Sequence, residues 1–134
     1  MALTVWIIDD DLVSQFATEY CIRQANSSAV VKSFDKASDS LRDFQECISK
    51  GSGIPQVILL DLVMPEMDGW DFLREIEKLV GWEDKVSVFI ISAFAKSRDR
   101  DLAKNHPLVK GYFDKPLSNG SADTIFQSVT VEDL

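Results

Sequence analysis

The sequence predicts an α/β fold: a doubly wound, five-stranded parallel sheet built as (βα)5. Short apolar runs of strand length alternate with stretches in which apolar residues recur at helical spacing. Several of these runs are nearly continuous, which is typical of parallel strands covered by helices on both faces. The length of 134 residues fits one domain. The periodicity fits flavodoxin-like and other small three-layer folds equally well, so it does not by itself indicate a function.

Five runs rich in β-branched and aromatic residues are the predicted strands. In chain order they are Leu3–Ile8, Ala29–Phe34, Gln56–Leu60, Val86–Ile91 and Val109–Phe113. Because connections between parallel strands are right-handed, we expect the intervening helices to lie on both faces of the sheet.

Apolar stripes predict a helix after each strand, and such stripes are typical of helices that pack one face on a core. In chain order the stripes are Val13, Phe16, Ala17 and Tyr20, with Gln24 as a polar exception; Ala37, Leu41, Phe44 and Ile48; Phe72, Leu73, Ile76, Leu79 and Val80; a weaker stretch, Lys96–Asn105, anchored by Leu102 and Ala103; and Ile125, Phe126 and Val129. We expect the last helix to span Asp123–Val129.

Capping and helix-breaking residues separate these elements. Asp11 is expected to cap the first helix, and Ser97 is a candidate cap for the fourth. The segment Gly51–Pro55 stops the second helix before the third strand. Gly81 is expected to close the third helix, and His106-Pro107 the fourth.

Composition and charge exclude several classes of protein. The chain has 22 acidic and 14 basic residues, a net charge of −8, so we expect neither nucleic acid nor a membrane surface as a partner. The longest apolar runs have four residues, far fewer than the roughly 20 of a membrane-spanning helix. The first basic residue, Arg23, leaves no charged region for a signal peptide. Cys21 and Cys47 have no metal-binding spacing and fit small buried residues in a reducing compartment, so we expect a cytoplasmic protein.

Polar residues follow the predicted strands at their carboxyl ends. Asp9 and Asp10 follow the first strand, Asp61 follows the third, and Ser92 and Lys115 follow the fourth and fifth. In an open α/β sheet these ends meet at one edge, where ligands bind. Carboxylates suit Mg²⁺, and a carboxylate is a possible nucleophile in phosphoryl transfer. A hydroxyl, an ammonium and Mg²⁺ would stabilise the resulting aspartyl-phosphate.

The chain resembles the receiver domain of two-component response regulators. The resemblance rests on Asp9-Asp10, Leu60-Asp61-Leu62-Val63-Met64-Pro65 with Asp68-Gly69, Ser92-Ala93, and Tyr112-Phe113-Asp114-Lys115-Pro116. It covers essentially the whole chain, and it implies the strand order 2-1-3-4-5. It also implies a single receiver domain over residues 1–134, with no output domain, that signals through protein–protein contacts.

The resemblance implies roles for individual residues. Asp61 would accept a phosphoryl group from a sensor histidine kinase or a histidine phosphotransfer protein. Mg²⁺ would be bound by Asp10, Asp61 and the Val63 carbonyl, and by Asp9 mostly through water. Lys115 would pair with the phosphoryl group. Ser92 would move to hydrogen-bond this group, and Tyr112 would follow as the aromatic switch; the Lys115–Pro116 bond is typically cis in this family.

Two further expectations concern the surface and the lifetime of the phosphorylated state. Lys96–Lys115 carries six basic and three acidic residues, a net +3 against −11 for the rest of the chain. This segment covers the predicted fourth helix and fifth strand, which with the fifth helix form a face through which receivers dimerise or signal. Val63 and Phe94, two residues after Asp61 and Ser92, are apolar and cannot orient water. We therefore expect slow self-dephosphorylation.

Two other functions are compatible with parts of the pattern. Asp9-Asp10-Asp11-Leu12-Val13 matches the start of a haloacid dehalogenase-type phosphatase, in which Asp9 would be the nucleophile and Asp11 the general acid. That family needs a further acidic pair at a strand end after the lysine, and no predicted strand follows Lys115. A receiver used only for docking is the other alternative, which the complete set of site residues disfavours. We expect the chain to catalyse only its own phosphorylation and dephosphorylation.

Overall fold

A computed structural model describes residues 3–79, 81–93 and 97–133, the last four by their backbone alone. Within these ranges five strands alternate with five helices. In chain order they are β1 (Thr4–Ile8), α1 (Leu12–Ala25), β2 (Val30–Phe34), α2 (Ala37–Lys50), β3 (Val57–Leu60), α3 (Gly69–Glu77), β4 (Ser87–Ser92), α4 (Ser97–Asn105), β5 (Val109–Asp114) and α5 (Asn119–Asp133). The ends of every strand lie within one residue of the prediction.

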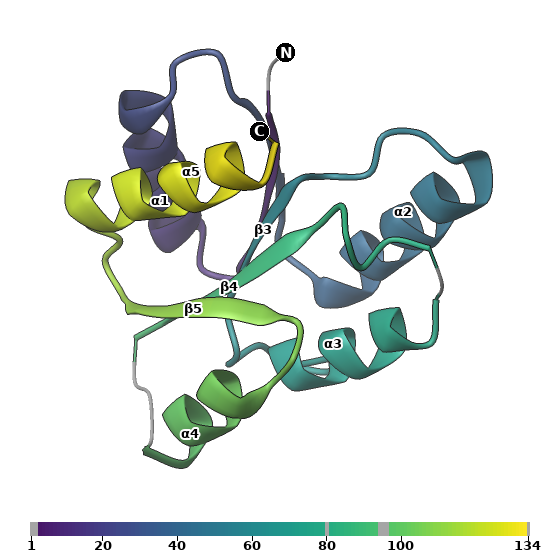
Figure 1. The fold of residues 1–134 in the computed structure, drawn as a ribbon. Coiled ribbons are helices and arrows are strands. Elements are labelled where there is room, and N and C mark those ends of the chain that lie inside the picture. Colours follow the sequence, from purple (N-terminus) through teal and green to yellow (C-terminus); the bar gives the residue numbers. More distant parts are fainter. Residues whose placement is uncertain (1–2, 80, 94–96, 134) are drawn as a thin grey trace.

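The strands form one parallel sheet in the order β2-β1-β3-β4-β5, which confirms the predicted topology. Helices α1 and α5 lie on one face, and α2, α3 and α4 lie on the other (Figure 1). Strands β2 and β5 are the two edges. On β2, Lys32 forms an ion pair with Asp43 of α2 at 2.6 Å and lies over the rings of Trp6 and Phe34.

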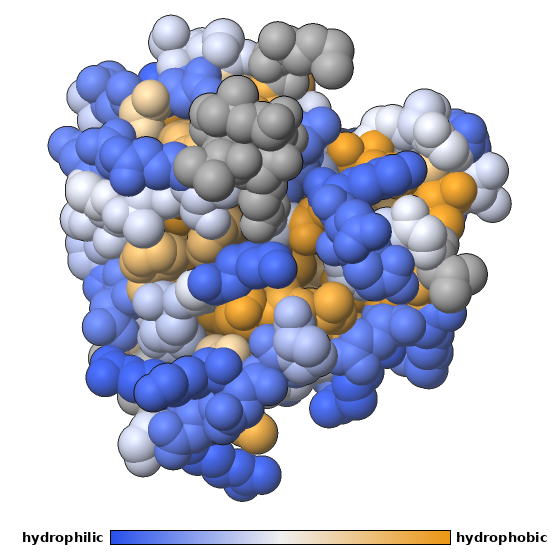
Figure 2. Space-filling model, in the orientation of Figure 1, coloured by the Kyte–Doolittle hydropathy of each residue, from blue (hydrophilic) through white to orange (hydrophobic). Residues whose placement is uncertain are grey.

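Each face of the sheet has its own apolar core. Under α2, α3 and α4 the ring of Phe44 contacts Trp6 and Trp82 with centroid distances of 6.1 and 5.3 Å. Under α1 and α5 the core is built around Ile22 and Ile125, both fully buried, and includes the rings of Phe89 and Phe126. The side chains of β3 and β4 are all buried, as the nearly continuous apolar runs predicted. Figure 2 shows hydrophobic residues gathered near β4 and β5, between the more hydrophilic surfaces of α5 and α4.

Helix α1 presents the predicted apolar stripe to solvent, so the prediction that this stripe packs on the core is wrong. Leu12, Val13, Phe16 and Tyr20 are 61–80% exposed. A second stripe, spaced at i, i+3, i+4 and i+7, faces the sheet and α5 instead; its members are Thr18, Cys21, Ile22 and Ala25. The spacing fits both faces, and the smaller residues form the packed one.

The third helix ends earlier than predicted. It spans Gly69–Glu77 and begins with a capping box in which Asp68 and Asp71 each accept a hydrogen bond from the other's backbone N–H. The indole N–H of Trp82 donates to the carbonyl oxygens of Ile76 and Leu79, at 2.9 and 3.0 Å. These bonds satisfy carbonyl groups at the end of the helix. Gly81 therefore lies in the following loop rather than closing the helix, and Val80 is outside the described residues.

The fourth and fifth helices also differ from their predicted limits. Ser97 is the first helical residue of α4 rather than its cap, and Lys96 is outside the described residues. Helix α5 begins at Asn119, before the predicted start at Asp123, because the Ser118 hydroxyl accepts the Ser121 N–H at 3.0 Å. It also continues past Val129 to Asp133.

Two observations concern membranes and cysteines. Among the helices of the described residues, none combines the length and apolar character needed to cross a bilayer. Cys21 and Cys47 are free thiols, as predicted, but both are half-buried rather than buried. The Cys21 thiol donates to the Leu117 carbonyl oxygen at 3.1 Å, which joins α1 to the start of α5.

Candidate functional site

Backbone hydrogen bonds between neighbouring strands hold the predicted site residues where the strands end. The N–H of Asp9 donates to the Phe34 carbonyl oxygen of β2 at 3.0 Å, and that of Asp61 donates to Ile8 of β1 at 2.9 Å. The N–H of Lys115 donates to Ser92 at the end of β4, also at 2.9 Å. The sheet thus fixes three charged residues along its carboxyl edge.

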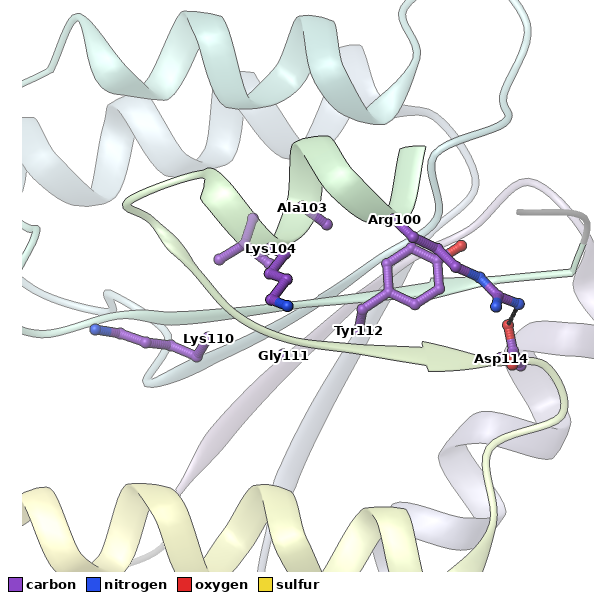
Figure 3. A pocket seen from close by; sticks show the side chains of 8 residues that line it. Arg100, Ala103, Lys104, Lys110, Gly111, Tyr112 and Asp114 are labelled. Atoms are coloured by element: carbon purple, nitrogen blue, oxygen red, sulfur yellow. Dashed lines mark hydrogen bonds and ion pairs between the residues drawn. The ribbon is translucent and has the colours of Figure 1, made fainter. Parts of the chain in front are cut away.

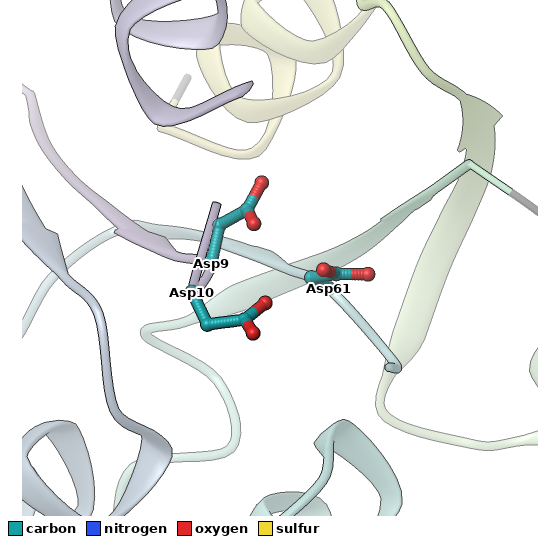
Figure 4. A group of neighbouring side chains, drawn as sticks. All are labelled: Asp9, Asp10 and Asp61. Carbon is teal, nitrogen blue, oxygen red and sulfur yellow. The ribbon is translucent and has the colours of Figure 1, made fainter. Parts of the chain in front are cut away.

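Three carboxylates meet at this edge. Asp9, Asp10 and Asp61 each offer one oxygen, and these oxygens lie within 4.8 Å of one another. Asp9 and Asp61 are buried, whereas Asp10 is exposed. Figure 4 shows Asp9 and Asp10 adjacent past β1, with their carboxylates turned to different sides, and Asp61 opposite them past β3. The cluster combines two carboxylates shielded from water with one that faces it.

Lys115 is the counter-charge of the cluster. Its ammonium lies 2.7 Å from Asp9 Oδ2 and 3.2 Å from Asp61 Oδ2. Burial acts to lower the pKa of Lys115, but the hydrogen bond and charge of Asp9, together with Asp61, outweigh burial and raise the pKa. Lys115 is therefore a stable cation shared by two carboxylates. The Lys115–Pro116 peptide bond is cis, as the resemblance implied.

The negative charge of the Asp61 carboxylate is only partly compensated by its surroundings. Burial raises the pKa of Asp61; Lys115 opposes this increase, and the Asp9 charge adds to it. The Val63 N–H also donates to Asp61 Oδ1, at 3.3 Å. One ammonium therefore compensates the cluster only in part. Hard oxygen ligands with uncompensated charge fit a divalent cation such as Mg²⁺.

The loop after β3 approaches the acceptor position closely at Gly69. A Cβ atom there would lie 2.6 Å from the Asp61 carbonyl oxygen and 2.9 Å from Leu62 Cα. Only glycine therefore allows the start of α3 to pack against the Asp61 backbone. The sequence showed Gly69 as part of a motif but did not show this requirement. Glu66 in the same loop has a left-handed backbone with φ of 65°.

Asp9 is held by Ser14 and Gln15, two residues whose contacts were not predicted from the sequence. The Ser14 hydroxyl donates to Asp9 Oδ2 at 2.6 Å, and the Gln15 side chain donates to the Asp9 carbonyl oxygen at 2.7 Å. The Asp11 N–H donates to Asp9 Oδ1 at 3.0 Å. Asp11 itself caps α1, as predicted, by accepting the backbone N–H groups of Val13 and Ser14. The sequence feature that could have indicated these contacts is the position of Ser14 and Gln15 in the first turn after the Asp11 cap.

The predicted switch residues lie beside the acidic cluster, Ser92 at the end of the strand next to β3 and Tyr112 on the strand beyond it. Ser92 is buried at the end of β4, paired in register with Asp114 of β5. The Tyr112 hydroxyl is buried and has no hydrogen-bond partner among the described residues. Tyr112 lines a groove of about 460 Å³ between α4 and β5, with Arg100 5.9 Å from its ring and paired to Asp114 at 3.1 Å (Figure 3).

Other residues discussed from the sequence lie outside the cluster. The His106 side chain lies 2.7 Å from a Glu77 carboxylate oxygen, at the end of α4. Val63 is 66% exposed beside the acceptor. Phe94, its predicted counterpart in slowing dephosphorylation, is outside the described residues.

Residues 5–127 match the response regulator receiver domain family. The chain belongs to this family. Several solved response regulators have a similar fold. The one from Cytophaga hutchinsonii has a TM-score of 0.88 and 22% identity, and the match covers 98% of this chain and 99% of that one. The one from Legionella pneumophila has a TM-score of 0.80 and 24% identity, and the match covers 96% of this chain and 98% of that one. A response regulator receiver protein from Dyadobacter fermentans has a TM-score of 0.81 and 24% identity over the same shares.

A curated relative shares a shorter segment with this receiver domain. A protein-glutamate methylesterase/protein-glutamine glutaminase of Treponema denticola is 52% identical over 42 residues. This segment is 31% of the present chain and 10% of the relative. The chain therefore matches only a small part of that protein.

Family membership assigns this receiver domain to two-component signalling. It agrees with the acidic cluster, because receiver domains bind Mg²⁺ in an acidic pocket and Asp9, Asp10 and Asp61 supply such ligands. The phosphatase alternative is not favoured. It would require membership of another family, whereas residues 5–127 match the receiver domain family.

Proposed function

We propose that this receiver domain is a phosphorylation-activated switch that takes a phosphoryl group on Asp61 in a Mg²⁺-dependent reaction. The donor is the phosphohistidine of a sensor histidine kinase or a histidine phosphotransfer protein. One observation carries the proposal: the buried Asp61 lies in a cluster with Asp9 and Asp10 and shares the Lys115 ammonium with Asp9, at the carboxyl edge of a receiver fold. We also place the protein in the cytoplasm, a proposal that its two free cysteines support.

In the proposed reaction an Asp61 oxygen attacks the phosphorus atom of the donor. The new O–P bond forms as the N–P bond breaks, and the electron pair of that bond remains on the donor imidazole, which takes a proton from solvent. The Lys115 ammonium, 3.2 Å from Asp61 Oδ2, is within reach of the incoming phosphoryl oxygens and stabilises their charge.

The metal would be held by Asp10, Asp61 and the Val63 carbonyl, with Asp9 bound mostly through water. When bound, Mg²⁺ neutralises phosphoryl charge and orients the group for in-line transfer. The exposed position of Asp10 supports this assignment, because it opens the cluster to solvent on one side. The raised pKa of Asp61 supports it as well, since a second cation would relieve the charge that Lys115 leaves uncompensated.

The exposed apolar face of α1 supports a protein as the phosphodonor. The exposed side chains of Leu12, Val13, Phe16 and Tyr20 run along α1, which begins two residues after Asp10. Val63, two residues after the acceptor, is also exposed. Large exposed apolar side chains that are contiguous mark interaction surfaces. A donor protein must cover the acceptor edge to deliver its phosphohistidine, so we propose that it docks on this face.

We propose that Ser92 and Tyr112 transmit the phosphorylated state to the α4–β5–α5 surface, where partners or a second copy of the chain would bind. The buried hydroxyl of Tyr112, which has no partner in the part of the chain that the structure describes, supports a residue with an alternative position, because an unmade hydrogen bond inside a protein is unfavourable. Arg100, Lys104 and Lys110 line the adjoining groove and favour an acidic partner surface. Slow loss of the phosphoryl group remains our expectation, since the exposed Val63 side chain cannot orient a water molecule.

A phosphorylation assay tests the proposal. The wild-type chain, Asp61→Asn, Asp9→Asn and the matched surface control Asp84→Asn are incubated with acetyl phosphate, with and without Mg²⁺, and analysed by intact mass. We expect Mg²⁺-dependent addition of one phosphoryl group to the wild type and to Asp84→Asn, none to Asp61→Asn and little to Asp9→Asn. Turnover of phosphate esters that requires Asp9 but not Asp61 would instead establish the phosphatase.

A further inference from the structure

We infer that Ser14 is a positioning residue of the metal site, which anchors the Asp9 carboxylate independently of Lys115. The inference rests on the proposed function. Its starting observation is the 2.6 Å hydrogen bond from the Ser14 hydroxyl to Asp9 Oδ2, the atom that also binds the Lys115 ammonium at 2.7 Å. Asp9 is 4% exposed, so its carboxylate is largely shielded from bulk water and depends on these two bonds.

Counting the described residues alone, the hydrogen bonds on Asp9 leave one acceptor position of its carboxylate free for a ligand. An ionised carboxylate has about four lone-pair positions. Ser14 and Lys115 occupy two of these on Oδ2, and the Asp11 N–H occupies one on Oδ1. The remaining position, on Oδ1, is the one available to a cation or to a water molecule bound to it. Ser14 therefore determines which oxygen of Asp9 serves the metal site.

Ser14 is better suited than Lys115 to hold this orientation. Its backbone is fixed in the first turn of α1, where its N–H donates to the capping carboxylate of Asp11 at 3.2 Å. The neighbouring Gln15 side chain holds the Asp9 carbonyl oxygen from the same turn. Lys115, in contrast, is shared with Asp61 through a long and flexible side chain.

Phosphorylation makes this difference important. A phosphoryl group on Asp61 presents new anionic oxygens to the Lys115 ammonium, which then divides its bonds between that group and Asp9. The hydroxyl of Ser14 keeps one bond to Asp9 Oδ2 throughout. We therefore assign Ser14 the task of keeping Asp9 oriented toward the metal while Lys115 turns toward the phosphoryl group.

The test begins with Mg²⁺ binding, measured by isothermal titration without any phosphodonor. Removing a hydrogen-bond partner of a metal-site ligand typically weakens metal binding by about 10-fold to 100-fold, and we expect Ser14→Ala to fall at the lower end of that range. In acetyl phosphate assays the Mg²⁺ concentration at half-maximal rate should rise by a similar factor. The maximal rate at saturating Mg²⁺ should stay close to that of the wild type.

Four control variants separate positioning from general damage. Ser14→Thr keeps a hydroxyl and should restore Mg²⁺ affinity. Ser28→Ala removes an exposed serine whose hydroxyl bonds Asn26 in the α1–β2 loop, and should match the wild type. Combining Ser14→Ala with Asp9→Asn should produce no loss beyond that of Asp9→Asn alone. Thermal melting of all variants shows whether they are folded.

Different results would overturn the inference about Ser14 and the proposed function. If the wild type binds Mg²⁺ and Ser14→Ala binds it equally well, the inference is overturned and the proposed function stands. A loss that persists unchanged in the Asp9→Asn background would also overturn the inference, because Ser14 would then act elsewhere. A wild-type chain that neither binds Mg²⁺ nor is modified at Asp61 would overturn the proposed function, and the inference with it.

Discussion

Helices α1 and α2 are equally long, 14 residues each, but they use their apolar residues in opposite ways. In α2 the predicted stripe faces the sheet: Ala37, Leu41 and Phe44 are buried there. In α1 the predicted stripe faces solvent, and Thr18 and Ile22 are buried instead. Both stripes have helical spacing, so spacing alone does not distinguish a packing face from an exposed one.

The difference indicates that one region of the molecule serves mainly phosphorylation and another mainly stability. The first region is the acidic edge of the sheet together with α1, which begins at that edge. The second is α2 with the aromatic core beneath it, where Phe44 contacts Trp6 and Trp82. We expect substitutions in the second region to change stability, and substitutions in the first region to change phosphorylation.

The largest effect on stability is expected from Phe44→Ala. Phe44 is fully buried between two tryptophan rings, and truncating a buried Phe typically costs about 3–5 kcal/mol through lost burial and the remaining cavity. Chemical denaturation should therefore show a large fall in the free energy of unfolding. A loss below about 1 kcal/mol would mean that α2 does not depend on this contact.

On α1, Phe16→Ala and Tyr20→Ala should leave the free energy of unfolding within about 0.5 kcal/mol of the wild type, because both side chains are exposed. If the face binds the donor, phosphotransfer from a cognate donor protein should fall by an order of magnitude or more, as for other aromatic hot spots. Phosphorylation by acetyl phosphate should be unchanged, since a small donor needs no docking face. Equal rates with the protein donor would contradict the proposed docking.

The caps of the two helices allow a matched pair of substitutions. Asp11 caps α1 through its side chain, whereas Lys36 at the same position of α2 makes no side-chain cap hydrogen bond. Asp11→Ala should cost about 1 kcal/mol. Lys36→Ser should stabilise the protein by up to about 1 kcal/mol, because the backbone at Lys36 already has the extended conformation of a cap. Thermal melts of the two variants in parallel would show opposite shifts in Tm.

The smallest expected effect is the change in stability that Asp61→Asn causes in the absence of metal. Because burial raises the pKa of Asp61, the folded chain binds a proton there more tightly than the unfolded chain does. Ionisation of Asp61 therefore lowers the free energy of unfolding as the pH rises from the ordinary aspartate pKa through the raised pKa, and this loss of stability persists at neutral pH. Asp61→Asn should raise Tm modestly at neutral pH in the presence of EDTA, and less at acidic pH. A lower Tm would show that the bond to Lys115 outweighs burial.

The parts of the fold that follow from local residue patterns were predictable. The strands, their order once the resemblance was noted, and the positions of Asp9, Asp61 and Lys115 at strand ends all follow from apolar runs and motifs. The errors arose where side-chain contacts decide. The indole of Trp82 bonds the carbonyl groups of Ile76, inside α3, and of Leu79, just beyond it, and helical spacing does not indicate these contacts.

The site shows the same limit. Its charged residues are adjacent to strands and could be placed from the sequence, but their partners could not. Ser14 contacts Asp9 because the turn into α1 brings the two side chains together, and the requirement for Gly69 depends on how closely α3 approaches Asp61. Such contacts depend on the relative placement of whole elements, which residue spacing does not encode.

The lysines on the edge strands have a consequence for behaviour at high concentration. An edge strand offers unpaired backbone groups to which another chain could add a strand, and lysine on such a strand opposes that addition. Lys32 on β2 and Lys110 on β5 place a positive charge on each edge of the sheet. Joining sheets edge to edge would bring such charges together in a poorly hydrated contact. The two lysines therefore oppose edge-to-edge pairing of this small sheet with another copy of itself.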